Sequence, residues 1–162
     1  MGKTKTPFNT PLETGVRALA ILDAMFPSWL DLQRLVQFDY LVVHSGDAGG
    51  PESLHPPVPL RTGELLVRRE IIEKGLLLMM SRDLVRRVPS PAGIHYQASD
   101  KANAFLSALT AGYIAKLRER AAWIADRFAD VTDEEIKKTT RRLFRAWTME
   151  FHQIERSHGE EG

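Results

Sequence analysis

The fold is decided by residues 84–98, which read Leu84-Val85-Arg86-Arg87-Val88-Pro89-Ser90-Pro91-Ala92-Gly93-Ile94-His95-Tyr96-Gln97-Ala98. Two short runs of β-favouring residues, 84–88 and 94–98, flank a turn that contains proline and glycine. This pattern predicts a β-hairpin. Because a hairpin alone is only marginally stable in water, we expect this one to pack against the helix that precedes it.

Helices are predicted on both sides of the hairpin, because apolar residues recur there at helical spacing. Upstream we expect three helices, at about 10–26, 28–45 and 62–82. Downstream we expect three more, at 100–109, from after Gly112 to 128, and at 132–156. Thr10 is typical of a residue that caps a helix, and Asp100 and Thr132 are the expected caps of two later helices.

The segment between the second and third predicted helices has a different composition. From Ser45 to Pro59 it contains Gly46, Gly49, Gly50, Pro51, Pro56, Pro57 and Pro59. No helix or central strand is expected to tolerate so many breaking residues. We therefore predict a loop at 45–60.

The order helix, helix, long helix, hairpin, helix is typical of a winged-helix unit. We predict a mainly α fold with a small β-hairpin, in which a winged-helix-like core carries additional C-terminal helices. The predicted parts are a flexible N-terminal arm at 1–9, a winged-helix-like domain at 10–109 with its wing at 84–98, a C-terminal helical extension at 110–156 packed on or beside it, and a tail at 157–162.

Composition narrows the classes of function. The 162 residues are 43% hydrophobic and 27% charged, which is enough to build a core. With 22 basic and 21 acidic residues the net charge is +1, which excludes a polycation that coats nucleic acid by net charge alone. The absence of cysteine excludes disulfides, thiolate metal sites and cysteine nucleophiles. The longest apolar stretch, 75–80, is too short to span a bilayer, so we expect a cytoplasmic protein without a membrane partner.

Basic residues gather in the third predicted helix and the wing. Residues 61–91 hold seven basic and four acidic side chains, whereas residues 1–60 have an acidic excess. In a winged helix these elements can approach a DNA groove, and the same residues can instead face an acidic protein surface or solvent. The candidates for binding DNA or a partner protein are Arg61, Arg68, Arg69, Lys74, Arg82, Arg86 and Arg87.

A second candidate set lies in and beside the predicted loop and consists of His44, Asp47, Glu52 and His55. Imidazoles and carboxylates can bind zinc or manganese, but this spacing matches no helix-based ligand pair such as HExxH. We interpret the four residues as a partner-docking loop, with a metal-dependent hydrolase as the weaker alternative. The sequence contains no nucleophile elbow or phosphate-binding motif, so we expect no catalytic residue, no metal and no cofactor.

Short segments between residues 8 and 128 carry a family resemblance. They are FNTPLETG (8–15), DLQRLV (31–36), HSGD (44–47), GGPESLHPP (49–57), Arg68-Arg69 and KGLLL (74–78). The run GPESLHPP is unusual and is the most specific of them. In these segments the chain resembles the middle component of bacterial ABC three-component defence systems of the Lamassu type, the LmuC-like subunits.

The resemblance implies a small non-catalytic adaptor that assembles with two larger proteins. These are an SMC-like ATPase (LmuB-like) and an effector (LmuA-like), often a nuclease, in a complex that acts against phage or plasmid DNA. The adaptor would bridge the two, and double-stranded DNA is a further candidate partner through the complex. The alternative from a different class is a free-standing winged-helix transcription regulator that dimerises through its C-terminal helices.

Overall fold

The computed structural model describes residues 10–55, 64–128, 130–132, 134–139 and 141–142, with only the backbone described at 64–67. The predicted arm at 1–9, the part of the last helix beyond residue 142 and the tail at 157–162 lie outside these residues. So does the part of the predicted loop from residue 56 onwards. Among the helices that are described, none is long and apolar enough to cross a membrane.

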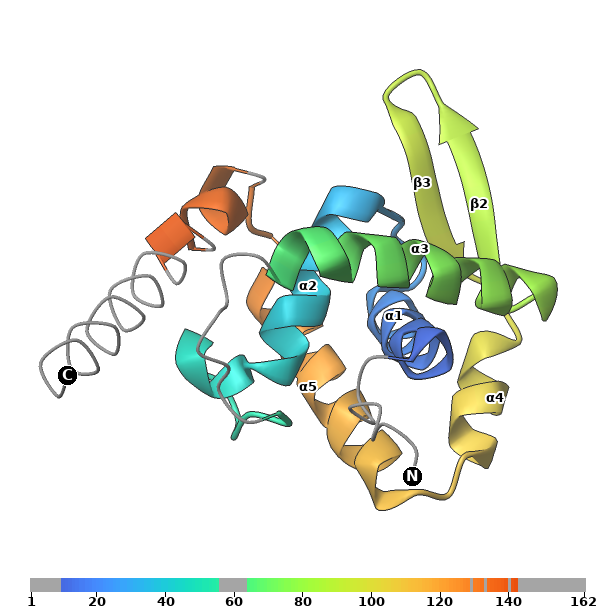
Figure 1. Ribbon diagram of the computed structural model, residues 1–162, viewed down its shortest axis with the longest axis horizontal. Coiled ribbons are helices and arrows are strands. Elements are labelled where there is room, and N and C mark those ends of the chain that lie inside the picture. The colour runs from blue at the N-terminus through green and yellow to red at the C-terminus, as the bar shows by residue number, and fades with distance from the viewer. Residues whose placement is uncertain (1–9, 56–63, 129, 133, 140, 143–162) are drawn as a thin grey trace, which may run out of the picture.

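The fold is mainly α-helical with one small antiparallel sheet, as predicted (Figure 1). The sheet has the strand order β1-β3-β2. Together with the order of the first six main elements, α1-β1-α2-α3-β2-β3, this is a winged-helix-like arrangement. The elements are α1 (Pro11–Met25), β1 (Leu30–Asp31), α2 (Leu32–Val43), the 3-10 helix η1 (Ser45–Ala48), α3 (Glu64–Ser81), β2 (Val85–Ser90), β3 (Gly93–Ala98), α4 (Ala102–Ala108) and α5 (Gly112–Phe128).

The first strand is an element that periodicity did not predict. We expected a helix from about residue 28, but Leu30 and Asp31 pair with Tyr96 and His95 of β3. Asp31 also caps α2, since its carboxylate accepts a hydrogen bond from the Arg34 N–H at 2.7 Å. An N-cap residue has extended backbone, so one residue satisfies the end of the strand and the start of the helix.

Two further expectations about local structure are wrong. Asp100 does not cap α4: the N-cap position is Lys101, which has no side-chain cap hydrogen bond. Just before it, the Ser99 hydroxyl accepts from the Lys101 N–H at 3.2 Å and donates to the Asp83 carbonyl at 2.7 Å. This serine therefore also fixes the base of the hairpin. The predicted loop begins with the 3-10 turn η1, in which Gly49 takes the left-handed conformation that ends it.

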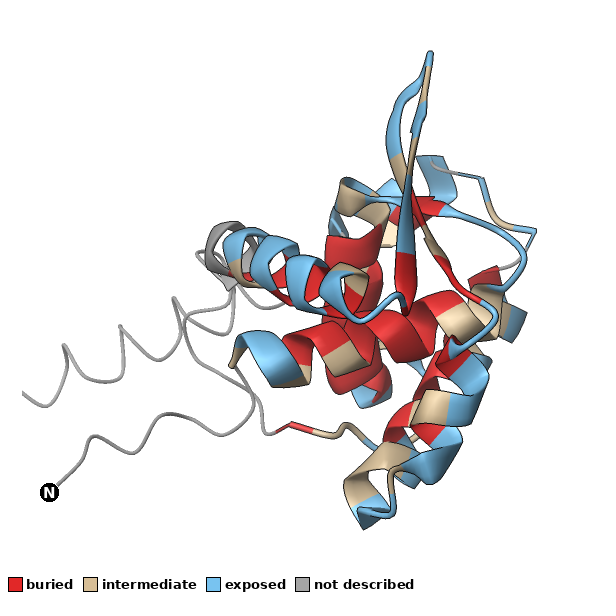
Figure 2. Cartoon of the chain, turned by 90° about the vertical axis from the view of Figure 1, so that its right-hand side faces the viewer, coloured by how far each residue is buried: buried red, intermediate tan, exposed pale blue. Residues whose placement is uncertain are grey.

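The core lies around α1, which contacts α3, α4 and α5 (Figure 1). Figure 2 shows the buried residues gathered in the helical body, while the far end of the hairpin is exposed. Apolar side chains of α5 belong to the same core, so this helix packs directly on the winged-helix-like part. Core members from the helices are Leu19, Leu22, Leu35, Phe38, Ile72, Leu76, Leu106, Leu117 and Ile124.

The crossing of α1 and α3 is a direct contact between two glycines. A Cβ added at Gly15 would lie 2.7 Å from the Gly75 carbonyl oxygen, and one added at Gly75 would lie 2.6 Å from the Gly15 nitrogen. No side chain fits there without a shift of the backbone. Glycine is a poor helix former, so these two residues are explained by the close approach of the helices.

We predict that Gly15→Ala destabilises the fold by about 1–3 kcal/mol, because the added methyl group forces α1 and α3 apart. Chemical denaturation followed by circular dichroism measures the change. Gly112→Ala is the matched control, since nothing lies within 4 Å of a Cβ at Gly112. The explanation is contradicted if both variants unfold at the denaturant concentration of the unmodified chain.

Candidate functional site

Three charged residues from three helices meet inside the protein. Asp39 of α2 accepts a hydrogen bond from Arg17 of α1, with Nε to Oδ1 at 2.9 Å, and its other carboxylate oxygen binds Arg68 of α3. Arg17 and Asp39 are each 1% exposed, and Arg68 is 5% exposed. Removing one member would leave a buried charge without its compensation. This buried triad therefore ties α1, α2 and α3 together.

The charges in the triad reinforce one another. Burial alone would raise the pKa of Asp39, but the positive charges of Arg17 and Arg68 outweigh burial and lower that pKa. The Arg17 side chain also donates to the Thr14 hydroxyl at 3.3 Å. The Arg68 guanidinium lies over the Tyr40 ring at 5.0 Å from its centroid.

The triad continues into the loop through His55 and Tyr113. His55 Nε2 lies 3.1 Å from the Tyr113 hydroxyl of α5. Tyr113 in turn interacts with Arg17, so the loop, α5 and the triad form one polar network. Burial, and then the charge of Arg17, lower the pKa of His55 to about 4, which keeps the imidazole neutral beside the arginines at neutral pH.

The loop from His44 to His55 is held by its own hydrogen bonds. The Ser45 hydroxyl donates to the Pro51 carbonyl at 2.8 Å, and the Gly46 N–H donates to the Ser53 hydroxyl at 3.0 Å. The His55 N–H donates to the Val43 carbonyl at 3.1 Å, which closes the loop onto the end of α2. These bonds define the path of a segment that has little regular structure.

Helix α5 holds the same loop from outside. Arg120 donates from Nε and Nη2 to the Glu52 carbonyl at 3.0 and 2.8 Å. Gly50 lies against the Trp123 ring, and a Cβ there would come within 2.4 Å of it. Sequence reasoning missed Arg120 and Tyr113, because an arginine that binds a backbone carbonyl 68 residues away leaves no pattern in the sequence.

The structure separates the four loop candidates into two kinds. His44 and His55 are buried, against the Tyr40 ring and the Tyr113 hydroxyl respectively, whereas Asp47 and Glu52 are exposed on the loop surface. In the described parts of the chain, no group of three or more His, Asp and Glu residues is placed to hold a metal ion. The four residues therefore do not form one cluster: two are part of the interior and two lie on the surface of the loop.

The basic candidates also fall into distinct places. Arg61 lies outside the described residues. Arg68 is a member of the buried triad, so it does not contribute to the exposed surface. Arg69 and Lys74 are exposed on α3, but each forms an ion pair one turn away, with Glu73 at 3.8 Å and Glu70 at 3.5 Å. Arg82, Arg86 and Arg87 are exposed at the end of α3 and on the hairpin.

Arg86 and Arg87 face opposite sides of the hairpin, because successive side chains of a strand alternate. Arg87 pairs in register with Tyr96, on the side that faces α3. Arg86 pairs with Gln97, whose side chain donates to the Pro27 carbonyl on the other side. The two neighbouring arginines therefore lie on two different surfaces of the hairpin.

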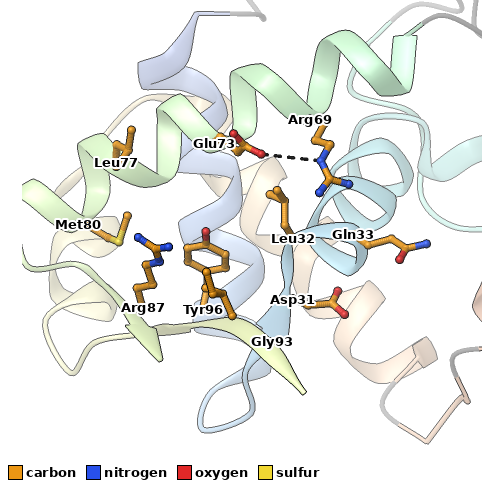
Figure 3. A pocket seen from close by; sticks show the side chains of 11 residues that line it. Asp31, Leu32, Gln33, Arg69, Glu73, Leu77, Met80, Arg87, Gly93 and Tyr96 are labelled. Carbon is orange, nitrogen blue, oxygen red and sulfur yellow. Dashed lines mark ion pairs between the residues drawn. The ribbon is translucent and has the colours of Figure 1, made fainter. Parts of the chain in front are cut away.

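An open groove of about 640 Å³ lies between the outer face of α3 and the hairpin (Figure 3). We call it the α3–hairpin groove. Figure 3 shows Arg87 and Tyr96 directed from the hairpin towards α3, with the Arg69–Glu73 ion pair at one end. Its lining combines apolar and charged side chains: Asp31, Leu32, Gln33, Arg69, Glu73, Leu77, Met80, Arg87, Gly93, Ile94 and Tyr96.

The groove is suited to a protein partner more than to a nucleic acid. Asp31 and Glu73 balance the charges of Arg69 and Arg87 in its lining, so the groove lacks the excess of positive charge that binding a phosphate backbone requires. Leu77 and Ile94 are 60% and 40% exposed at its rim. Exposed apolar residues beside paired charges are typical of a surface that another protein covers.

Comparison with known proteins identifies a family. The family model for the ABC-three component (ABC-3C) system Middle Component 2 matches residues 7–150. Neither a curated protein nor a solved structure matches the chain.

We predict that Asp39→Ala destabilises the fold by about 3–5 kcal/mol, because it leaves two buried guanidinium groups without a carboxylate. The measurement is the free energy of unfolding in denaturant. Glu70→Ala removes an exposed carboxylate that pairs with Lys74, and should cost less than about 1 kcal/mol. Equal stability of the two variants would contradict the role of the triad.

We also predict that His55 makes stability depend on pH. Its pKa is about 4 in the folded chain against an ordinary 6.5, so the unfolded chain binds more protons between these values. The contribution is present above about pH 6.5 and is lost as the pH falls towards 4, with a slope of at most about 1.4 kcal/mol per pH unit. Urea unfolding at a series of pH values should show this slope in the unmodified chain and in His95→Gln, and a reduced slope in His55→Gln.

Proposed function

Because the chain belongs to the ABC-three component (ABC-3C) system Middle Component 2 family, we propose that it is a non-enzymatic cytoplasmic adaptor of a Lamassu-like defence complex. In this proposal it bridges an SMC-like ATPase and an effector nuclease in a complex that acts against phage or plasmid DNA. The observation that carries the proposal is the match of the family model to residues 7–150.

The charge distribution on α3 supports binding to protein. In a DNA-binding winged helix the third helix enters the major groove, which favours an exposed basic face. Here the exposed charges described on α3 are Arg69, Glu70, Glu73 and Lys74, two of each sign in neighbouring pairs. Leu77 and Leu78 are exposed beside them. This face offers apolar contact and balanced charge, as protein interfaces do.

A bridging subunit needs two separate contact surfaces, and two features of the fold support this role. The α3–hairpin groove is lined by residues of α3 and the hairpin. The loop from His44 to His55, on which Asp47 and Glu52 are exposed, lies away from the hairpin (Figure 1). The buried triad connects the helices between them. The groove and the loop are each held in place by the packed helices, so binding at both requires little ordering of the adaptor itself.

The hairpin supports a second candidate function, a free-standing winged-helix transcription regulator. Arg82 and Arg86 are exposed near its base, outside the α3–hairpin groove, and a basic wing can contact phosphates. Such a regulator would dimerise and read half-sites about one or two helical turns apart.

We predict that the tagged chain, expressed together with its two companion components, captures a large coiled-coil ATPase in stoichiometric amount. The measurement is affinity purification followed by mass spectrometry and light scattering. A chain that captures no companion, forms a stable dimer and binds one DNA sequence at about nanomolar concentration would contradict the adaptor and favour the regulator.

A further inference from the structure

We propose that the α3–hairpin groove binds an amphipathic α-helix of a partner subunit, and that a carboxylate on this helix pairs with Arg87. The inference rests on the proposed adaptor function and specifies one of its two contact surfaces. It follows from the shape of the groove, from its apolar lining and from one arginine that the groove leaves available.

Apolar side chains from both α3 and the hairpin line the groove. Leu77 and Met80 come from α3 and lie at the end away from Arg69, and Tyr96 comes from the hairpin (Figure 3). Ile94 of the hairpin also lines the groove. Leu77 at 60% exposure and Ile94 at 40% lie where a bound segment would cover them. Because the groove is open along its side, it would leave much of a small molecule in water, whereas a polypeptide can lie along it.

A helix fits this groove better than an added strand does. A strand binds by pairing with the free N–H and C=O groups of a sheet edge. The α3–hairpin groove is instead lined by side chains from α3 and from the inner face of the hairpin. Apolar side chains that project into a groove are the partners of the i, i+3 and i+4 positions of an amphipathic helix.

The charged residues of the groove indicate which side chain the partner helix carries. Arg69 at the edge of the groove already pairs with Glu73, and Asp31 caps α2. Among the residues that the structure describes, no carboxylate lies within ion-pair distance of Arg87. An arginine at the rim of an apolar groove favours a partner with an acidic residue beside its apolar stripe.

Two pairs of adjacent residues provide a matched test. Leu77 and Leu78 are neighbouring exposed leucines of α3, but only Leu77 lines the groove. Arg87 lines the groove, and Arg86 faces the other side of the hairpin. Within each pair the two substitutions change the same chemistry at nearly the same place, so a general effect on folding or solubility should be similar in both.

The experiment co-expresses the full-length tagged chain with its companion components and measures how much of each is captured. Leu77→Asp and Arg87→Glu should reduce capture of one companion at least about tenfold, whereas Leu78→Asp and Arg86→Glu should change it less than about twofold. A photo-crosslinking amino acid in place of Ile94 should crosslink to a peptide of that companion. This peptide should contain an acidic residue three or four positions from two apolar residues.

The outcomes separate this inference from the proposed function. If the unmodified chain captures companions but all four variants capture them equally, the groove is not the contact surface and the adaptor function stands. Equal loss in all four variants also overturns the groove as the specific site. Crosslinking to DNA, to a second copy of the chain or to its own C-terminal segment overturns the helix as occupant. Capture of nothing by the unmodified chain contradicts the adaptor function itself.

Discussion

The carboxylate of Asp39 is the point on which the arrangement of the helices depends. One of its oxygens binds Arg17 of α1 and the other binds Arg68 of α3. One side chain of α2 therefore connects all three helices of the winged-helix-like core. A buried carboxylate is costly without compensation, and so is a buried guanidinium. Each partner therefore makes the burial of the others possible. Apolar packing alone would tolerate small rotations of the helices, whereas this triad favours one relative placement.

This internal constraint has a consequence for the outer surfaces. Arg68 belongs to the triad, and one residue further along α3 is Arg69, whose side chain is exposed beside the α3–hairpin groove. On the other side, Arg17 interacts with Tyr113, which contacts His55 at the end of the loop. The groove and the loop are thus connected to one buried network. This network and the apolar core around α1 together keep the groove and the loop in a fixed relation to each other.

Features that arise from neighbouring residues could be predicted from the sequence, whereas features that arise from contacts between distant residues could not. The hairpin, α1 and α5 arise from local patterns of turn residues and apolar spacing, and these were predicted. Strand β1 has two residues, too few for any period to be visible. Arg68 resembled its neighbour Arg69 in sequence, and only its pairing with an aspartate 29 residues away distinguishes the two. A signal was available in Asp39, an ionisable residue in the largely apolar run Phe38 to Val43, where a buried partner is needed.

The contacts between the loop and α5 also bear on how this chain can vary. The winged-helix-like element order is complete before residue 112, yet Arg120, Trp123 and Tyr113 of α5 hold the segment from Gly50 to His55. A fragment cut after α4 would keep every strand and lose those anchors. The loop and α5 therefore form one structural module: a changed loop would require compensating changes in a helix some 60 residues later, and grafting the loop elsewhere would require the helix as well.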